Sequence, residues 1–272
     1  MINGLSFDIE DWFQVENLKG VCPYHEWNKF ESRVERNTDI ILELLSRYQH
    51  KATFFILGWV AERKPGLVKR IAKEKHEIAS HGYKHELVYR ISPETFRDDL
   101  KLSKKILEEV TGTKIIGYRA PNFSITNDSL WALDILAELG FSYDSSIFPT
   151  SFHDRYGFDG IKENTISIFP NGLFEFPLTV WKVGKLNFPL GGGAYFRLLP
   201  YNVFRCLLKK INNSEKNFIF YLHPWELDEH QPRMRVNLKY RFRHYINLDK
   251  TQSKLKKLLD DFNFQPLKNF LK

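Results

Sequence analysis

Short apolar segments alternate along this chain with longer segments whose apolar residues recur every three or four positions. The short segments are typical of buried strands, and the longer ones are typical of amphipathic helices. We expect strands within residues 2–7, 52–58, 77–79, 114–118 and 217–223. We expect helices within residues 37–48, 65–74, 92–112, 127–140 and 248–261. Strands and helices that alternate at this spacing favour a parallel α/β fold, either an open sheet or a barrel.

Two of the expected helices carry recognisable boundary signals. The longest has Ser92 as its expected cap, Pro93 at its first position and Gly112 just past its end. The first has Asn37 or Thr38 as its expected cap. These helix ends are predicted only from the capping residues close to them in the sequence.

Residues 145–195 interrupt the alternation with segments such as LFEFPLTVW and LGGGAYF, which contain glycine or proline. We expect loops and irregular strands there, lying over one face and not forming a separate domain. The chain has no internal repeat and no low-complexity linker. We therefore expect one domain over residues 1–272, of which residues 228–272 form a basic C-terminal extension.

The composition argues against a disordered chain and against a membrane span. Hydrophobic residues make up 43% of the sequence, which is enough for a sizeable core. No run approaches the roughly 18 uncharged apolar residues that a membrane-spanning helix requires. The N-terminus also lacks the basic start, apolar stretch and cleavage site of a signal peptide. We therefore expect a cytoplasmic protein, either free or peripheral at the inner membrane face.

Positive charge is concentrated in one segment near the C-terminus. Residues 231–257, here called the basic segment, carry nine Lys or Arg and one Asp, a net +8 in a chain whose total is +7. Such a segment can bind phosphate groups or an anionic membrane surface, or it can be a solvated loop and helix face. Tyr240, Phe242 and Tyr245 lie between the charges, as in some single-stranded nucleic-acid sites. We expect phosphate or membrane contact, with nucleic acid the less favoured partner.

Polar residues cluster where five apolar segments end. In GLSFDIEDW, residues 4–12, the acids Asp8, Glu10 and Asp11 follow the first apolar run. Later segments are followed by SHGYKH, YRAPNF, YDSS and HPWE. The loops at the carboxyl ends of strands converge in parallel α/β folds. We therefore expect these clusters to meet in one site.

His81 and His85 stand four residues apart, a spacing that points both imidazoles to one side of a helical turn or tight loop. A carboxylate from Asp8, Glu10 or Asp11 would complete a set of two histidines and one carboxylate, with coordination positions open for water. Such a site is typical of a hydrolytic metal. The alternative is a pair of surface histidines that bind no metal.

A hydrolytic site also needs a base, an acid and a group that keeps the base ionised. A second carboxylate beside the metal ligand can take a proton from water, Arg119 can keep that carboxylate charged, and His223 can protonate the leaving group. Each residue also has a structural alternative. Asp8 could cap a helix, Arg119 could form a structural ion pair, and His223 could hydrogen-bond in the core.

Four ordered motifs resemble those of the polysaccharide deacetylases of carbohydrate esterase family four, which are metal-dependent de-N-acetylases of amino sugars. These motifs are SFDIED, SHGYKH, YRAPNF and YLHPWE. The chain also resembles a bacterial branch linked to exopolysaccharide and exosortase gene clusters, through FDIEDWF, GGGAYFR, HPWE and its basic tail. The resemblance implies a distorted parallel (β/α) barrel of about seven strands, with an irregular inserted region and the basic extension.

The roles known in this family can be carried over by position. Asp8 matches the catalytic base, and Arg119 matches the residue that orients the base. His81 and His85 match metal ligands, and His223 matches the general acid.

One position departs from the family pattern. Much of the family has two adjacent aspartates, the second of which binds the metal, whereas Ile9 follows Asp8 here. Some relatives space the two acids by one residue, and that match makes Glu10 the third ligand. Asp11 is the alternative ligand, because a difference of one residue at a strand end decides which side chain faces the pocket.

The resemblance implies a metal-dependent hydrolase that removes the N-acetyl group from an amino sugar in exopolysaccharide or capsule biosynthesis. Zinc is the expected metal, with cobalt or nickel as alternatives, and the expected substrate is a polysaccharide precursor or a nucleotide- or lipid-linked glycan. Expected substrate-binding residues are Tyr118, Pro121, Asn122, Glu175, Trp225 and Glu226. Glu175 and Glu226 are also candidates for orienting His223.

Two other functions fit parts of the sequence. One is a metal-free hydrolase of cyclic amides from the same superfamily, and the presence of both His81 and His85 argues against it. The other is a non-catalytic protein that binds glycans or nucleic acid, because a fold does not imply a function. The sequence leaves the oligomeric state open, and a homo-oligomer is compatible with it.

Overall fold

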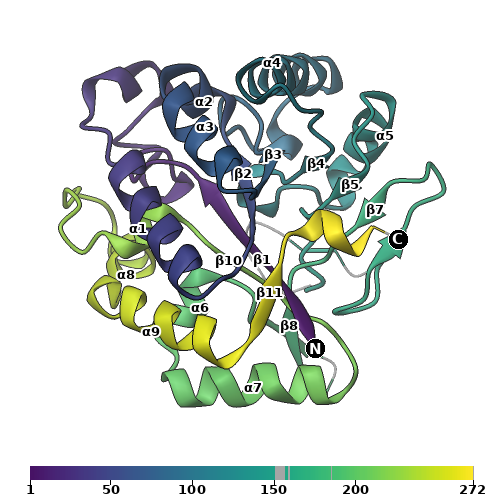
Figure 1. Cartoon of the computed structure of the whole chain (residues 1–272). Coiled ribbons are helices and arrows are strands. Elements are labelled where there is room, and N and C mark those ends of the chain that lie inside the picture. Colours follow the sequence, from purple (N-terminus) through teal and green to yellow (C-terminus); the bar gives the residue numbers. More distant parts are fainter. Residues whose placement is uncertain (151–156, 159, 185, 272) are drawn as a thin grey trace.

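The computed structural model describes residues 1–150, 157–158, 160–184 and 186–271, and its centre is a curled, mostly parallel sheet (Figure 1). Seven of its parallel strands follow one another in the spatial order β10 (Ile219–Leu222), β1 (Ile2–Ile9), β2 (Thr53–Ile56), β3 (Glu77–Ser80), β4 (Gly117–Tyr118), β5 (Tyr143–Asp144) and β7 (Phe174–Glu175). β6 (Ser167–Ile168) continues the sheet antiparallel to β7. The expected α/β fold with a parallel, barrel-like sheet is confirmed.

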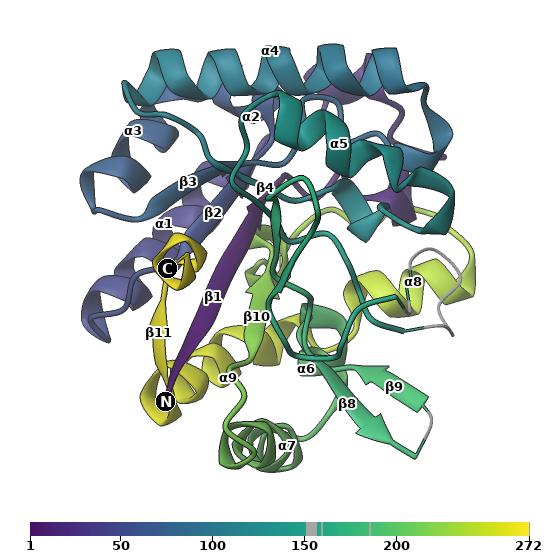
Figure 2. The same cartoon turned by 90° about the vertical axis from the view of Figure 1, so that its right-hand side faces the viewer.

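Most helices lie around the outside of the sheet (Figures 1 and 2). The longer ones are α1 (Val34–Arg47), α3 (Pro65–Lys73), α4 (Pro93–Thr111), α5 (Trp131–Glu138), α7 (Tyr201–Asn213) and α9 (Leu248–Asp261). The shorter ones are α2 (Gly58–Arg63), α6 (Gly193–Leu198) and α8 (Leu238–Tyr245). No helix in the described part of the chain is long and apolar enough to cross a membrane.

In the described ranges, β7 and β10 do not pair with each other, and irregular chain lies between them. Thr179 Oγ1 accepts a hydrogen bond from Ile219 N at 2.7 Å, and Gly191 O accepts one from Tyr221 N at 2.8 Å. A Cβ atom on Gly191 would lie 2.7 Å from Ile219 O, so this close approach requires glycine. The barrel is distorted because these contacts replace a regular ladder.

The region of residues 145–195 contains regular strands as well as loops. It includes β6 and β7, and β7 joins the parallel sheet beside β5. It also includes a separate antiparallel hairpin, β8 (Val180–Val183) and β9 (Leu186–Pro189). Within this region, residues 151–156, 159 and 185 lie outside the described residues.

The C-terminal residues complete the sheet and part of the core. β11 (Asn263–Gln265) pairs in parallel with residues Ile2–Gly4, at the start of β1 (Figure 2). Leu255 and Leu258 of α9 are fully buried. The part of the chain expected to form a basic extension therefore contributes both a strand and a packed helix to the fold.

The boundary signals of α4 predicted its ends correctly. Ser92 Oγ accepts a hydrogen bond from Thr95 N at 3.2 Å, and Gly112 takes a left-handed φ of +65° past the last turn. α9 also covers the expected residues, 248–261. Local capping and periodicity were sufficient for these two helices.

The expected start of α1 was wrong. The helix begins at Val34, and Asn37 and Thr38 are buried inside it. The backbone N–H groups of Arg33 and Val34 donate to the carboxylate of Asp11, at 2.9 and 3.2 Å. A carboxylate from outside the helix therefore satisfies its first N–H groups and moves its start towards the N-terminus.

Candidate active site and metal centre

The alternation of side chains along β1 places two of its three nearby acids on one face. Leu5, Phe7 and Ile9 are fully buried in the apolar layer that includes the outer helices. Successive side chains of a strand point to opposite faces, so Asp8 faces the interior of the curled sheet. Glu10, directly after the strand, continues this alternation. Both acids line the same cavity.

Glu10, His81 and His85, here called the ligand triad, are buried and bring one ligand atom each to within 4.8 Å of one another. Glu10 Oε2 lies 2.7 Å from His85 Nε2, yet it has no hydrogen-bond partner among the described residues. His81 Nδ1 contacts the backbone O of Arg119 at 2.8 Å, which leaves Nε2 as its nitrogen for a metal. A buried carboxylate oxygen this close to an imidazole nitrogen, with a second imidazole beside it, fits a divalent metal.

The surroundings of Glu10 and His81 favour the protonation states in which these two residues bind a metal. Burial alone would raise the pKa of Glu10, but the nearby His85 and His223 outweigh burial and lower this pKa to about 2. Burial lowers the pKa of His81 to about 4. At neutral pH, Glu10 is therefore ionised and His81 is neutral, as metal coordination requires.

Asp11, the alternative ligand, does not belong to this group. Its carboxylate accepts hydrogen bonds from the backbone N–H groups of Trp12, Arg33 and Val34 at 3.0, 2.9 and 3.2 Å. These contacts hold it at the start of α1. The geometry therefore favours Glu10 as the third ligand.

Arg119 is fully buried behind Asp8. Its Nη1 lies 2.7 Å from Asp8 Oδ1 and donates to Ser6 Oγ at 2.8 Å. Its Nε and Nη2 donate to the backbone O and the Oγ of Ser145, at 3.0 and 2.9 Å. The guanidinium is held in place and in turn holds one oxygen of Asp8. Ser6 and Ser145 were not predicted, although Ser145 lies in the YDSS cluster and Ser6 lies on the same face of β1 as Asp8.

His223 follows β10 and faces both acids of β1. Its Nε2 lies 3.2 Å from Glu10 Oε1 and 3.8 Å from Asp8 Oδ2, and its Nδ1 lies 2.8 Å from Glu226 Oε1. Burial alone would lower the pKa of His223, but the carboxylates of Glu10, Glu226 and Asp8 raise it to about 9. His223 therefore carries a proton at neutral pH and can donate it.

Glu226 is held by Arg197, a buried residue that the sequence reasoning missed. Arg197 Nε donates to Glu226 Oε2 at 2.7 Å. The two Nη atoms of Arg197 donate to the backbone carbonyls of Arg243, His244 and Ile246 at distances from 2.8 to 3.0 Å. Arg197 therefore connects the end of α8 with the partner of His223. Its place in the GGGAYFR motif is the signal that could have identified it.

The glycines of this motif allow the backbone to approach the site. A Cβ atom on Gly193 would lie 2.1 Å from the carboxylate oxygens of Glu226. One on Gly192 would lie 2.4 Å from Tyr221 Oη. Side chains at these positions would displace groups that line the cavity.

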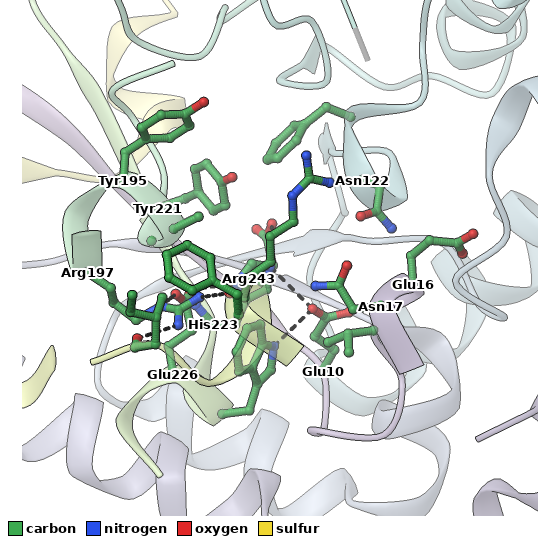
Figure 3. Close-up of a pocket in the computed structure, with 18 of the residues that line it drawn as sticks. Glu10, Glu16, Asn17, Asn122, Tyr195, Arg197, Tyr221, His223, Glu226 and Arg243 are labelled. Atoms are coloured by element: carbon green, nitrogen blue, oxygen red, sulfur yellow. Dashed lines mark hydrogen bonds and ion pairs between the residues drawn. The ribbon is translucent and has the colours of Figure 1, made fainter. Parts of the chain in front are cut away.

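The cavity that contains these groups has a volume of about 680 Å³ (Figure 3). Of the expected substrate-binding residues, Asn122, Trp225 and Glu226 line it. Trp225 Nε1 donates to Glu10 Oε1 at 3.2 Å, so this indole orients a member of the ligand triad. Figure 3 shows Glu226 and His223 together on one side of the cavity.

The other three expected substrate-binding residues lie elsewhere. Tyr118 is buried against Phe96 of α4, because its side chain points from β4 towards the helices. Pro121 is buried and does not line the cavity. Glu175 Oε1 accepts a hydrogen bond from Ile147 N at 3.1 Å, and burial raises the pKa of this carboxyl well above its usual range. Glu175 therefore orients neither His223 nor a sugar in this cavity.

Two family models match successive parts of the chain. Residues 27–143 match polysaccharide deacetylase, and residues 145–272 match a domain of unknown function, DUF3473. A peptidoglycan-N-acetylglucosamine deacetylase of Bacillus cereus is 36% identical over 98 residues, which are 36% of this chain and 36% of that protein. The chain thus spans about a third of the length of this curated relative.

Solved structures share the fold over nearly the whole chain. A structure from Mycobacterium smegmatis, assigned as a polysaccharide deacetylase, has a TM-score of 0.59 at 18% identity and covers 98% of this chain and 87% of its own. A Puue allantoinase has a TM-score of 0.60 at 14% identity and covers 96% and 85%. At these identities the likeness shows the fold alone. The match over residues 27–143 identifies this part of the chain as a polysaccharide deacetylase domain.

Proposed function

We propose that this protein is a metal-dependent hydrolase that removes the N-acetyl group from an amino sugar. The observation that carries the proposal is the meeting of the ligand triad with Asp8 and His223 in one cavity. This arrangement supplies a metal centre, a base and an acid. The family match and the named activity of the Bacillus cereus relative support the same reaction.

The ligand triad would hold one divalent ion, with zinc expected and cobalt or nickel as alternatives. When bound, such an ion polarises the acetamide carbonyl and lowers the pKa of coordinated water. Trp225 holds the side chain of Glu10, and the backbone O of Arg119 holds the ring of His81. Contacts of this kind typically change metal affinity by about 10- to 100-fold.

Asp8 and His223 would transfer the protons. Asp8 Oδ2, the oxygen opposite the Arg119 contact, would take a proton from the attacking water as the new C–O bond forms. His223 Nε2 would give its proton to the amide nitrogen as the C–N bond breaks. The products are acetate and a free amino sugar.

The two alternative functions explain fewer of these contacts. A metal-free hydrolase of cyclic amides would leave the buried Glu10 Oε2 with only its contact to His85 Nε2. A non-catalytic binder of glycans or nucleic acid has no use for an acid, a base and a ligand triad in one cavity. The metal-dependent reaction uses all of them.

We further infer that the substrate is a precursor of an exopolysaccharide or capsule, carried by a nucleotide or a lipid. The FDIEDWF and GGGAYFR motifs support this branch of the family. The basic segment would then contact a phosphate group or an anionic membrane surface. The reaction would take place in the cytoplasm, at or near the inner membrane face.

Acetate release from N-acetylated chito-oligosaccharides tests the reaction. We expect the metal-loaded protein to release acetate and Asp8→Asn to lose about a hundredfold or more in kcat, because the base is gone. Asp98→Asn, which changes an exposed acid on α4, is the matched control and should behave as wild type. Retention of most activity by Asp8→Asn, or full activity after removal of metal by a chelator, would show that the mechanism is wrong.

A further inference from the structure

One face of α8 forms a wall of the catalytic cavity. This α8 wall consists of Leu238, Lys239, Phe242, Arg243 and Ile246. Their spacing places them on one side of the helix and of the residue that follows it. The same cavity contains the ligand triad and the general acid. A substrate larger than one sugar can therefore contact the α8 wall while its N-acetyl group lies at the catalytic groups.

The α8 wall presents large apolar side chains to solvent. Leu238 is 81% exposed and Phe242 is 55% exposed. α6 adds Tyr195 and Leu198 to the lining of the same cavity, and Leu198 is 47% exposed. Exposed apolar side chains that gather around a cavity mark a binding site for an apolar group.

Charge is divided between two parts of the cavity. In the catalytic part, the carboxylates of Asp8 and Glu226 pair with Arg119 and Arg197, whereas the α8 wall carries the cations of Lys239 and Arg243. Figure 3 shows Arg243 among the side chains that line the cavity. The cations of the α8 wall attract an anionic group. A substrate that carries an anion would therefore place it beside α8.

α8 is firmly attached beside the catalytic groups. The ring of His244, on its buried side, stacks on Trp225 with 4.3 Å between ring centroids. Arg197 donates to backbone carbonyls at the end of α8 and to the carboxylate of Glu226. The exposed apolar residues therefore belong to an anchored helix and not to a loosely attached end.

Three kinds of substrate carrier can be compared with this wall. A neutral polysaccharide supplies neither an anion nor an apolar group. A nucleotide supplies phosphates, but its polar base and ribose would not cover aliphatic side chains. Building on the hydrolase function above, we propose that the substrate is an N-acetylated amino sugar joined through a phosphate or diphosphate to a long apolar chain. The α8 wall binds this carrier, with its cations on the phosphate and its apolar side chains on the chain.

Binding of the carrier alone tests the inference without catalysis. The full-length, metal-loaded protein would be titrated with farnesyl phosphate, farnesol and inorganic phosphate by calorimetry. Farnesyl phosphate should bind most tightly, because only it supplies both groups. The double variants Leu238→Ser/Phe242→Ser and Lys239→Gln/Arg243→Gln should each weaken its binding about tenfold or more.

Val203→Ser and Lys209→Gln are the matched controls, because both change exposed residues of α7 that neither line the cavity nor belong to the basic segment. They should bind farnesyl phosphate as wild type does. Farnesyl phosphate that binds no more tightly than inorganic phosphate, or an equal loss in the control variants, would overturn the inference.

Acetate release then separates the carrier site from the hydrolase function. N-acetylglucosamine would be offered on a polyprenyl diphosphate, on uridine diphosphate and in a neutral oligosaccharide. The first should have a kcat/KM at least about tenfold above the others. A preference for either of the others would overturn the inference. Carrier binding without acetate from any substrate would support the carrier site and overturn the hydrolase function.

Discussion

At the scale of single residues, the site depends on which way each acid near the end of β1 points. Asp8 and Glu10 are two residues apart and enter the cavity, whereas Asp11 turns to the start of α1. The side-chain period of a strand is two, so a shift of one residue would exchange a catalytic position for a structural one. We therefore expect substitution of Glu10 to affect metal binding and substitution of Asp11 to affect stability.

Glu10→Gln should abolish stable metal binding, because it removes the charged oxygen from the ligand triad. Asp11→Asn, the matched variant, should keep the metal but lower the free energy of unfolding by about 1–2 kcal/mol, because it weakens the contacts that start α1. Elemental analysis and chemical denaturation measure the two effects. Metal loss in Asp11→Asn alone would show that the wrong acid has been assigned.

At the scale of elements, α6 and α8 together determine the position of the general acid. Arg197 of α6 binds both the end of α8 and Glu226, and Glu226 binds His223. If α6 moved, Arg197 would shift Glu226, and Glu226 would in turn shift the ring of His223. The glycine run before α6 allows this close packing.

Gly193→Ala tests this connection, because the new Cβ would lie 2.1 Å from the carboxylate of Glu226. We expect kcat to fall at unchanged metal content, with a loss in stability of about 1–3 kcal/mol from overpacking. Gly66→Ala in α3 is the control, since the nearest atom to its Cβ would be Arg70 Nη1 at 3.9 Å. Acetate release and metal content would be measured for both. Wild-type kcat in Gly193→Ala would rule out a role for this packing in catalysis.

The helices whose ends are set by their own capping residues and periodicity were predicted well from the sequence. α4 and α9 follow their caps and periodicity, whereas α1 begins early because Asp11 lies outside it. Of the motif residues at strand ends, Asp8, Glu10, His81, His85 and His223 converge on one cavity. Arg197 was missed because its partners are backbone carbonyls of α8 and a glutamate of another element. Glu175 was misplaced because the sequence did not show that β7 directs it away from the cavity.

At the scale of the whole molecule, the site is assembled from distant parts of the chain. Residues 27–143 supply the two histidines of the ligand triad, and residues 145–272 supply His223. Asp8 lies in β1 and Glu10 directly follows it, and this strand precedes both regions and pairs with β2 and β10. Neither matched region alone contains the complete set of groups.

The stability of the whole molecule should fall in mild acid partly because of His76. Burial lowers the pKa of this histidine from 6.5 to about 4. As the pH falls below 6.5 the unfolded chain binds the proton first, so stability is fully present above that pH and declines towards pH 4. The total effect would be about 3 kcal/mol.

His76→Asn isolates this contribution, because the asparagine oxygen can still accept the hydrogen bond that Ala52 N donates to His76 Nδ1. Denaturant unfolding between pH 7 and pH 4 would be compared for the two proteins. The variant should show a shallower decline in the free energy of unfolding. Parallel curves would show that His76 does not take up a proton on unfolding.

The metal content of the purified, full-length chain tests the central claim most directly. After incubation with zinc, we predict close to one ion per chain by elemental analysis, and its loss in the double variant His81→Ala/His85→Ala. His25→Ala/His230→Ala, which changes two exposed histidines outside the cavity, should keep the ion. Wild-type protein that binds no stoichiometric zinc, cobalt or nickel, or a triad variant that keeps its ion, would contradict the account.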